Sequence, residues 1–313
     1  MSFLRAKADE DCTPEAVLYI ANAAFDFAVY LMERKDFKSA FQLLGADLSL
    51  VYDLASRLEC LVGLRQLARS HKLFAYCQED PYTSRSFTKP RGYSGDAVIL
   101  DFLYFSSVPD GTSATGREIF NKKTKGPVAC SAVFRKDFAR AFIDDTLSRV
   151  DAPRMLALAS GHCRELEASL LASNSTFEFV AVNEDSETCD NLQQIHNNIQ
   201  VYHDSAAGYL ESSRGEFDLI YAFGLWDMVA DHKANALAKK LESHLRPTGK
   251  LVLSKFSKSC IERGYMDLFM DLQLFCESST DIRTIMETNL ECQYFSDPNN
   301  NVGYLIVNNS KKM

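Results

Sequence analysis

Apolar residues recur at helical spacing through the first half of the chain, and no strand pattern stands out before residue 150. Thr13 and Pro14 provide start signals for the first helix, which we expect to break near Lys35–Asp36. The residues between the helices are rich in Pro, Gly, Ser and Thr, which is typical of loops. The expected helical stretches are residues 14–45, 47–78, 97–107, 117–126 and 127–150. The expected loops are residues 79–96 and 108–116.

The pattern changes after Pro153, where short apolar runs alternate with amphipathic stretches. Strands that alternate with helices predict a parallel sheet with helices on both faces. The last segment, "ECQYFSDPNNNVGYLIVNN" (291–309), predicts two strands joined by a turn. We therefore expect an α/β fold of five parallel strands plus a C-terminal antiparallel hairpin (151–313), preceded by a helical domain (1–150). The expected parallel strands are residues 154–160, 177–183, 199–203, 217–223 and 249–256, with helices at 163–173, 186–198 and 233–245.

Composition narrows the classes of partner and site. The formal net charge of −8 disfavours a nucleic-acid partner, which needs a basic face. The charged start lacks a secretory signal, and no apolar run approaches the roughly 20 residues of a membrane span. The nine cysteines form no CxxC pair or Cys/His cluster, so we expect no metal site and a cytoplasmic location. The expected partners are a small molecule and a second copy of the chain, bound through the N-terminal helices.

Two strand ends carry candidate contacts for a nucleotide-like ligand. In "LALASGHCREL" (156–166), small residues precede a helix, so a ligand can approach the backbone at Ala159, Ser160 and Gly161. An ordinary strand–helix turn explains the same residues. About 20 residues further on, nucleotide-binding α/β domains place a carboxylate that binds ribose. This chain offers Asn183 and Glu184 there, and a helix N-cap is the alternative.

The third and fourth expected strands also end in polar or aromatic residues. Asp204 and Ser205 follow the third strand in "YHDSA", where Asp204 equally suits a helix N-cap. The fourth ends in "FGLWD" (223–227), which we expect to expose aromatic residues at the carboxyl edge of the sheet. For Trp226, the single tryptophan of the chain, the alternative is core packing, which is the commoner role of such a residue.

The chain resembles class I methyltransferases that use S-adenosyl-L-methionine (SAM) in three sequence segments, "KPRGYSGDAVILDFLY", "LASGHCREL" and "DLIYAFGLWDMV". The closer resemblance is to the bacterial 3-hydroxy fatty acid methyl ester synthases, which make a quorum-sensing extracellular factor. It covers roughly Lys89 to the C-terminus, and "RGYSGD" and "SGHCRE" are its specific parts. The chain departs from the family pattern near the cofactor site. Ala157, Ala159 and Cys163 replace an acid and two glycines of the turn, His162 stands where Pro is usual, and Asn183 stands where Asp is usual.

The resemblance implies a Rossmann-like SAM-binding domain with the N-terminal helices as a lid or substrate domain. It implies SAM contacts at the ends of the first three expected strands, with Asp204 and Ser205 binding the adenine edge. It implies cofactor contacts at Phe223 and Gly224, and catalytic roles for Trp226 and Asp227 near the transferred methyl group. The loop "RGYSGD" would cover the cofactor, with Arg91 on the methionine carboxylate and Tyr93 at the sulfonium or the acceptor. The alternative is a connecting turn in which Arg91 pairs with Asp96 or Asp101.

The implied reaction is methyl transfer to a small-molecule acceptor. A carboxylate acceptor is already ionised and needs no base, whereas a hydroxyl or amine does. His203, Asp227 and His232 are the candidate bases, and none forms an evident catalytic constellation. This favours a carboxylate or another acceptor that is already nucleophilic, and the resemblance implies a fatty-acid-like carboxylate that becomes a methyl ester. The alternatives are an O- or N-methyltransferase of secondary metabolism and a catalytically silent SAM-fold subunit that binds a partner.

Overall fold

A computed structural model describes residues 12–169, 176–212, 215–227, 229, 231–273, 282, 285–286 and 288–309, the side chains of residues 46, 231 and 232 excepted. The chain forms two compact units. The first combines Met1–Ala129 with Ile261–Gln273, and the second combines Cys130–Cys260 with Leu274–Met313. The expected division at residue 150 differs from this one because helix α10 (Pro127–Arg149) crosses the boundary.

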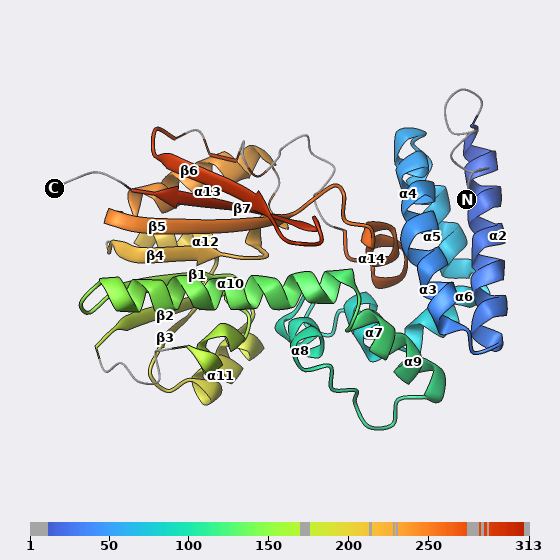
Figure 1. Cartoon of the computed structure of the whole chain (residues 1–313), viewed down its shortest axis with the longest axis horizontal. Coiled ribbons are helices and arrows are strands. Elements are labelled where there is room, and N and C mark those ends of the chain that lie inside the picture. Colours follow the sequence, from blue (N-terminus) through green and yellow to red (C-terminus); the bar gives the residue numbers. More distant parts are fainter. Residues whose placement is uncertain are drawn as a thin grey trace. The chain divides into compact units, whose positions relative to one another are not determined.

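The described part of the first unit is helical, as the sequence predicts (Figure 1). The break near Lys35–Asp36 is confirmed: Lys35 has φ 63°, and Asp36 caps the next helix by accepting the Ser39 N–H. The expected helical stretch 47–78 is confirmed, and it consists of three helices. The helices are α2 (Pro14–Glu33), α3 (Phe37–Gln42), the π-helical turn η1 (Leu43–Asp47), α4 (Leu48–Arg57), α5 (Leu61–Ser70), α6 (Lys72–Gln78), α7 (Pro81–Thr88), α8 (Ala97–Phe105), α9 (Ala114–Lys123) and α14 (Arg263–Met270).

Helix α7 corrects the prediction of a loop at residues 79–96. Its residues are loop-like in composition, but Asp80 accepts the N–H groups of Tyr82 and Thr83, and Pro81 occupies the first turn. Both are helix start signals that the composition masks. The loop is therefore shorter and runs from Lys89, which ends α7 at φ 50°, to Asp96, which caps α8.

Helix α2 meets the length and composition of a membrane-spanning helix, although a third of its most apolar window is buried within the protein. Its buried side chains include Val17, Phe25 and Val29, whereas Tyr19 and Phe27 are exposed. The sequence prediction that no segment spans a membrane stays a prediction, because α2 meets these criteria by length and composition only. The cytoplasmic location stays a prediction.

The sheet of the second unit has the strand order β3-β2-β1-β4-β5-β7-β6 (Figure 1). The first five strands in this order run parallel, and β7 is antiparallel to both β5 and β6. The strands are β1 (Arg154–Leu158), β2 (Glu178–Asn183), β3 (Gln200–His203), β4 (Phe217–Ala222), β5 (Leu245–Phe256), β6 (Glu291–Ser296) and β7 (Val302–Asn308). The helices are α11 (Ser186–Ile195), α12 (Ala206–Ser212), α13 (Asp231–Ser243) and the short 3-10 helices η2 (Arg164–Ala168) and η4 (Leu225–Asp227).

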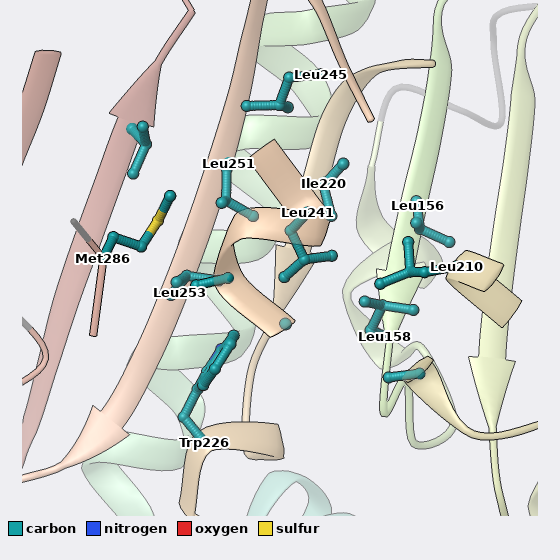
Figure 2. Close-up of a cluster of buried hydrophobic side chains, with 14 of the residues drawn as sticks. Leu156, Leu158, Leu210, Ile220, Trp226, Leu241, Leu245, Leu251, Leu253 and Met286 are labelled. Atoms are coloured by element: carbon teal, nitrogen blue, oxygen red, sulfur yellow. The ribbon is translucent and has the colours of Figure 1, made fainter. Parts of the chain in front are cut away.

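Two hydrophobic clusters lie on the two faces of this sheet. One joins β1, β2, β4 and β5 to α12 and α13, and Figure 2 shows Leu241 of α13 among the sheet residues Ile220 and Leu251. The other joins the opposite face to α10, through Ile143 and Leu147, and to α11. Side chains of successive strand residues alternate between these faces, which fixes the register of each strand. The expected α/β fold is thus present. Of the expected helix at 163–173, η2 is described, and residues 170–173 lie outside the described residues.

Candidate functional site

The predicted site residues of the second unit lie at the carboxyl ends of the parallel strands. Strand β1 lies between β2 and β4, with Leu158 opposite both Val182 and Ala222. The chain order reverses at β1, so this is the switch point at which open α/β sheets bind ligands.

The turn after β1 has an unusual backbone. Ala159, Gly161 and Cys163 have φ values of 50°, 55° and 46°, all in the left-handed region that favours glycine. The turn is fixed by hydrogen bonds from Ser160 N to the Val182 carbonyl (3.2 Å) and from Cys163 N to the Ser160 carbonyl (3.2 Å). The sequence substitutes two of three expected glycines, yet the backbone keeps the conformation that glycines would adopt.

A buried carboxyl group lies below this turn, which the sequence analysis missed. Tyr221 of β4 donates its hydroxyl to Glu165 Oε1 at 2.5 Å. Burial raises the pKa of Glu165, and it raises the pKa of the neighbouring Cys163 thiol well above its usual value. This pair joins η2 to β4. No local signal reveals it, because its partners lie 56 positions apart in the sequence.

The ends of β2 and β3 are adjacent, since Asp204 N donates to the Asn183 carbonyl at 3.1 Å. The Asn183 side-chain oxygen accepts the Asp185 N–H at 2.9 Å, and Asp185 is the residue that caps α11. The Glu184 side chain is exposed beside them. The two predicted ribose contacts therefore share this edge with Asp204, as the sequence predicts.

Ser205 caps helix α12, whereas the alternative interpretation of the sequence had Asp204 as the cap. The Ser205 hydroxyl accepts the Gly208 N–H at 2.9 Å, while Asp204 Oδ1 accepts the Ser205 N–H at 2.7 Å. A Cβ on Gly208 would lie 2.4 Å from Asp204 Oδ1, so the glycine leaves room for that carboxylate. Asp204 and Ser205 are both half-buried at the edge of the sheet.

The residues after β4 divide between the core and the edge. Phe223 is half-buried and contacts Tyr221, Phe138 and Tyr304 through its ring. Gly224, with φ 81°, is also half-buried. Trp226 is only 1% exposed and lies in the cluster of Figure 2, so the expected exposure of this indole is wrong. Its burial favours packing, and a catalytic role for Trp226 stays a prediction.

Asp227 is buried against an arginine that the sequence analysis did not select. Its Oδ1 accepts the Phe256 N–H at 2.6 Å, and its Oδ2 lies 3.5 Å from both terminal nitrogens of Arg135. Burial raises the pKa of Asp227, and the positive charge of Arg135 opposes that rise. Of the other candidate bases, His203 contacts the Glu184 carbonyl at 3.0 Å, and the side chain of His232 lies outside the described residues.

Arg91 and Tyr93 lie in the loop between α7 and α8 of the first unit, and both are half-buried. Arg85 pairs with Asp96 through contacts of 2.7–3.0 Å. Gly92 has φ 86°, a conformation that favours glycine, and a Cβ added there would meet no atom of the described residues within 4 Å. Contact of the loop with SAM or an acceptor stays a prediction.

Among the residues that the structure describes, no group of three His, Cys, Asp or Glu side chains could hold a metal ion. The expected dimer through the N-terminal helices stays a prediction.

Comparison with protein-family models finds no match, and comparison with curated proteins finds no similar sequence. A solved structure of a possible exported protein from Bordetella parapertussis is similar to almost the whole chain. It covers 95% of this chain and 97% of its own, with a TM-score of 0.59 and 15% sequence identity. At this identity the likeness shows a shared fold alone.

Two further solved structures are methyltransferases. The magnesium protoporphyrin IX methyltransferase of Synechocystis, with bound SAM, covers 71% of this chain and 96% of its own, at 15% identity and a TM-score of 0.47. The N-methyltransferase NodS of Bradyrhizobium japonicum covers 57% and 98%, at 14% identity and a TM-score of 0.41. At these TM-scores neither likeness extends the conclusion about the fold.

Proposed function

We propose that the protein binds SAM at the carboxyl edge of β1, β2 and β3 and transfers its methyl group to a small-molecule carboxylate. The observation that carries this proposal is the turn at Ala159, Gly161 and Cys163, which keeps three left-handed positions at the switch point of the sheet. Such a backbone is maintained against a steric cost at two of the three residues, which is typical of sites that bring a ligand close to the main chain.

The residues present at this edge fit the parts of SAM. The backbone at Ser160 and Gly161 would face the methionine part. Glu184, with an exposed carboxylate, and Asn183 would bind the ribose hydroxyls. Asp204 and Ser205 would bind the adenine edge. Asn183 keeps its side-chain NH₂ group as a donor, because its oxygen already accepts the Asp185 N–H.

SAM supplies an electrophilic methyl group, and an ionised carboxylate attacks it without a general base. The chain's task is then to align the acceptor and exclude water. The surroundings of Asp227 support a carboxylate over a hydroxyl acceptor. This group already accepts a backbone N–H and faces Arg135, so it is placed as a structural counter-ion rather than as a base. A fatty-acid-like acceptor follows from the sequence resemblance to the methyl ester synthases.

One observation favours a second candidate, a SAM-like domain without activity. Ala159 and Cys163 carry side chains where the turn favours glycine, and a Cβ restricts how closely a ligand approaches the main chain. The two candidates differ in whether the turn still accepts the cofactor.

The test is titration of S-adenosylhomocysteine into the parent protein, Gly161→Val and the control Gly111→Val. Gly111 also has a positive φ (79°), but it lies in a loop of the first unit. We expect the parent and the control to bind and Gly161→Val to lose binding while its thermal melt stays cooperative. Binding by Gly161→Val at parental affinity would place the cofactor elsewhere. No binding by the parent would favour the silent domain.

A further inference from the structure

Arg135, on the N-terminal half of α10, meets the sheet of the second unit at the carboxyl ends of β4 and β5. Its guanidinium carbon lies 5.0 Å from the centre of the Phe256 ring, and its terminal nitrogens face Asp227. Phe256 is the last residue of β5, and Asp227 lies in η4 directly after β4. The arginine therefore lies on the edge at which the parallel strands end, beside Phe223 and Gly224.

The contact between Arg135 and Asp227 is loose for a buried ion pair. Both terminal nitrogens lie 3.5 Å from the same oxygen, Oδ2, whereas close guanidinium–carboxylate bonds measure about 2.7–2.9 Å. The other oxygen of Asp227 is held by the Phe256 N–H at 2.6 Å. Asp227 thus balances the charge of Arg135 without forming the parallel pair of bonds that planar recognition of a carboxylate uses.

Gly224 leaves an approach to this guanidinium. A Cβ added there would lie 3.7 Å from Arg135 Nη1, and no other atom of the described residues comes within 4 Å of it. Gly224 is half-buried, so one side of it meets solvent. A ligand that passes Gly224 would reach Arg135 at the point where β4 ends.

Two buried hydroxyl groups lie on the same face of the sheet. Ser254 of β5 and Tyr304 of β7 are direct partners in the antiparallel ladder, so their side chains share a face. Both are fully buried. Within the described part of the chain the Ser254 hydroxyl has no hydrogen-bond partner, and the Tyr304 hydroxyl lies near enough to Arg135 to interact with it. Burial raises the pKa of Tyr304 to about 12, while the nearby charge of Arg135 lowers it. The Tyr304 hydroxyl is therefore a protonated donor close to the arginine.

Aromatic rings form an apolar surround for this polar group. The Tyr304 ring centre lies 4.9–6.0 Å from those of four phenylalanines, which come from α10, β6 and the end of β4. These are Phe134, Phe138, Phe223 and Phe295. A cation and hydroxyl donors next to apolar rings match a molecule with a carboxylate head and an apolar chain.

We infer that Arg135 binds the carboxylate of the methyl acceptor, with Asp227 as its resident counter-ion and the rings around Tyr304 contacting the acceptor's apolar chain. This inference rests on the methyl-transfer function proposed above. One carboxylate oxygen accepts hydrogen bonds from Arg135, and the other attacks the methyl carbon. The new O–CH₃ bond forms as the S–CH₃ bond breaks, the bonding pair stays on sulfur, and the products are a methyl ester and S-adenosylhomocysteine. No proton is transferred.

The test is titration of dodecanoate, and of dodecanol as an uncharged match, into protein saturated with S-adenosylhomocysteine. The variants are Arg135→Lys, Arg135→Gln and the double variant Arg135→Gln/Asp227→Asn, which removes both charges and leaves no unpaired buried carboxylate. The control is Arg140→Gln, because Arg140 lies on the same helix but is 38% exposed and meets Asp137 only at 3.7 Å. We expect the double variant to bind dodecanoate about 10- to 100-fold more weakly than the parent, by loss of a charge-assisted contact. Dodecanol and S-adenosylhomocysteine should bind all variants alike, and Arg135→Lys should recover only part of the dodecanoate affinity.

The outcomes separate this inference from the proposed function. Equal dodecanoate affinity, or equal methyl ester formation, in the parent and a folded double variant would overturn the role of Arg135 while the methyltransferase proposal stands. Dodecanoate binding that depends on Arg135, without methylation of any acid, would support the carboxylate site and refute carboxylate methylation. No dodecanoate binding by the parent would overturn the inference directly, whatever the titration of S-adenosylhomocysteine shows.

Discussion

Replacing Ala159 by glycine tests whether the turn after β1 carries strain at a cofactor site. An L-residue in the left-handed region costs about 1–2 kcal/mol, and glycine avoids this cost. Glycine loses about 0.5–1 kcal/mol in return, because its unfolded chain is more flexible. With φ 50° at Ala159, the difference predicts that Ala159→Gly stabilises the second unit by about 0–1.5 kcal/mol.

The chain provides a matched control in Ala152. It is also an exposed alanine, with φ 51°, but it lies before β1, at the opposite edge of the sheet. Ala152→Gly should therefore give the same gain in stability. Only Ala159→Gly should change the affinity for S-adenosylhomocysteine, because removing this Cβ lets the ligand approach the main chain. One improved hydrogen bond would tighten binding by about 2- to 10-fold.

The assay for stability is urea unfolding followed by tryptophan fluorescence. Trp226 is the single tryptophan and is 1% exposed in the core of the second unit, so its emission reports that unit. Cofactor affinity is measured by calorimetric titration. If Ala152→Gly tightens binding as much as Ala159→Gly, the effect is a general one on stability. If Ala159→Gly stabilises but leaves affinity unchanged, the turn is strained for a reason other than SAM.

Three further outcomes are expected. Asn183→Asp should keep or tighten binding of S-adenosylhomocysteine in calorimetry, because a carboxylate can still accept the Asp185 N–H and adds an acceptor for ribose; a large loss would mean that the amide NH₂ group is the contact. The raised pKa of Glu165 stabilises the folded parent at low pH, and this contribution is lost as pH rises through the folded pKa. Glu165→Gln should therefore gain stability relative to the parent as pH rises above the usual pKa of a glutamate. If urea unfolding gives the same difference in unfolding free energy between the two proteins from acid to neutral pH, this reasoning is contradicted. Asp267→Ala should lower the free energy of unfolding of the first unit by about 3–5 kcal/mol in far-UV circular dichroism, since it leaves the Arg65 charge unpaired; a loss below about 1 kcal/mol, the size for an exposed pair, would refute this reasoning.

Local sequence patterns predicted the sheet and the strand ends because both features depend on residues that are close together in the sequence. Alternating apolar runs place β1 to β5, and a residue directly after a strand must lie at the edge of the sheet. Gly161, Asn183 and Asp204 could be found in this way. The same logic failed for α7, where loop-like composition outweighed the start signals of Asp80 and Pro81.

Pairs distant in the sequence could not be predicted. Arg135 and Asp227 are 92 positions apart, and nothing in the helical pattern around Arg135 distinguishes it from other arginines of that segment. Whether Trp226 faces the core or the edge also depends on tertiary packing, because a single indole in a short turn carries no periodicity. The site is thus predictable where the backbone turns, and unpredictable where side chains meet across the fold.

The first unit is built from two segments that are far apart in the sequence, and this affects how the chain folds while it is being synthesised. All residues of α14 are buried except Arg263, and Asp267 at its centre binds Arg65 and Tyr52, which are 202 and 215 positions away. The N-terminal helices therefore leave the ribosome long before the helix that fills their centre. We expect them to await it in a loosely packed form, so that the unit completes folding only after most of the sheet has been translated. A fragment that ends at residue 150 should accordingly be prone to aggregation and dependent on chaperones, whereas supplying α14 as a separate peptide should restore its cooperative melting.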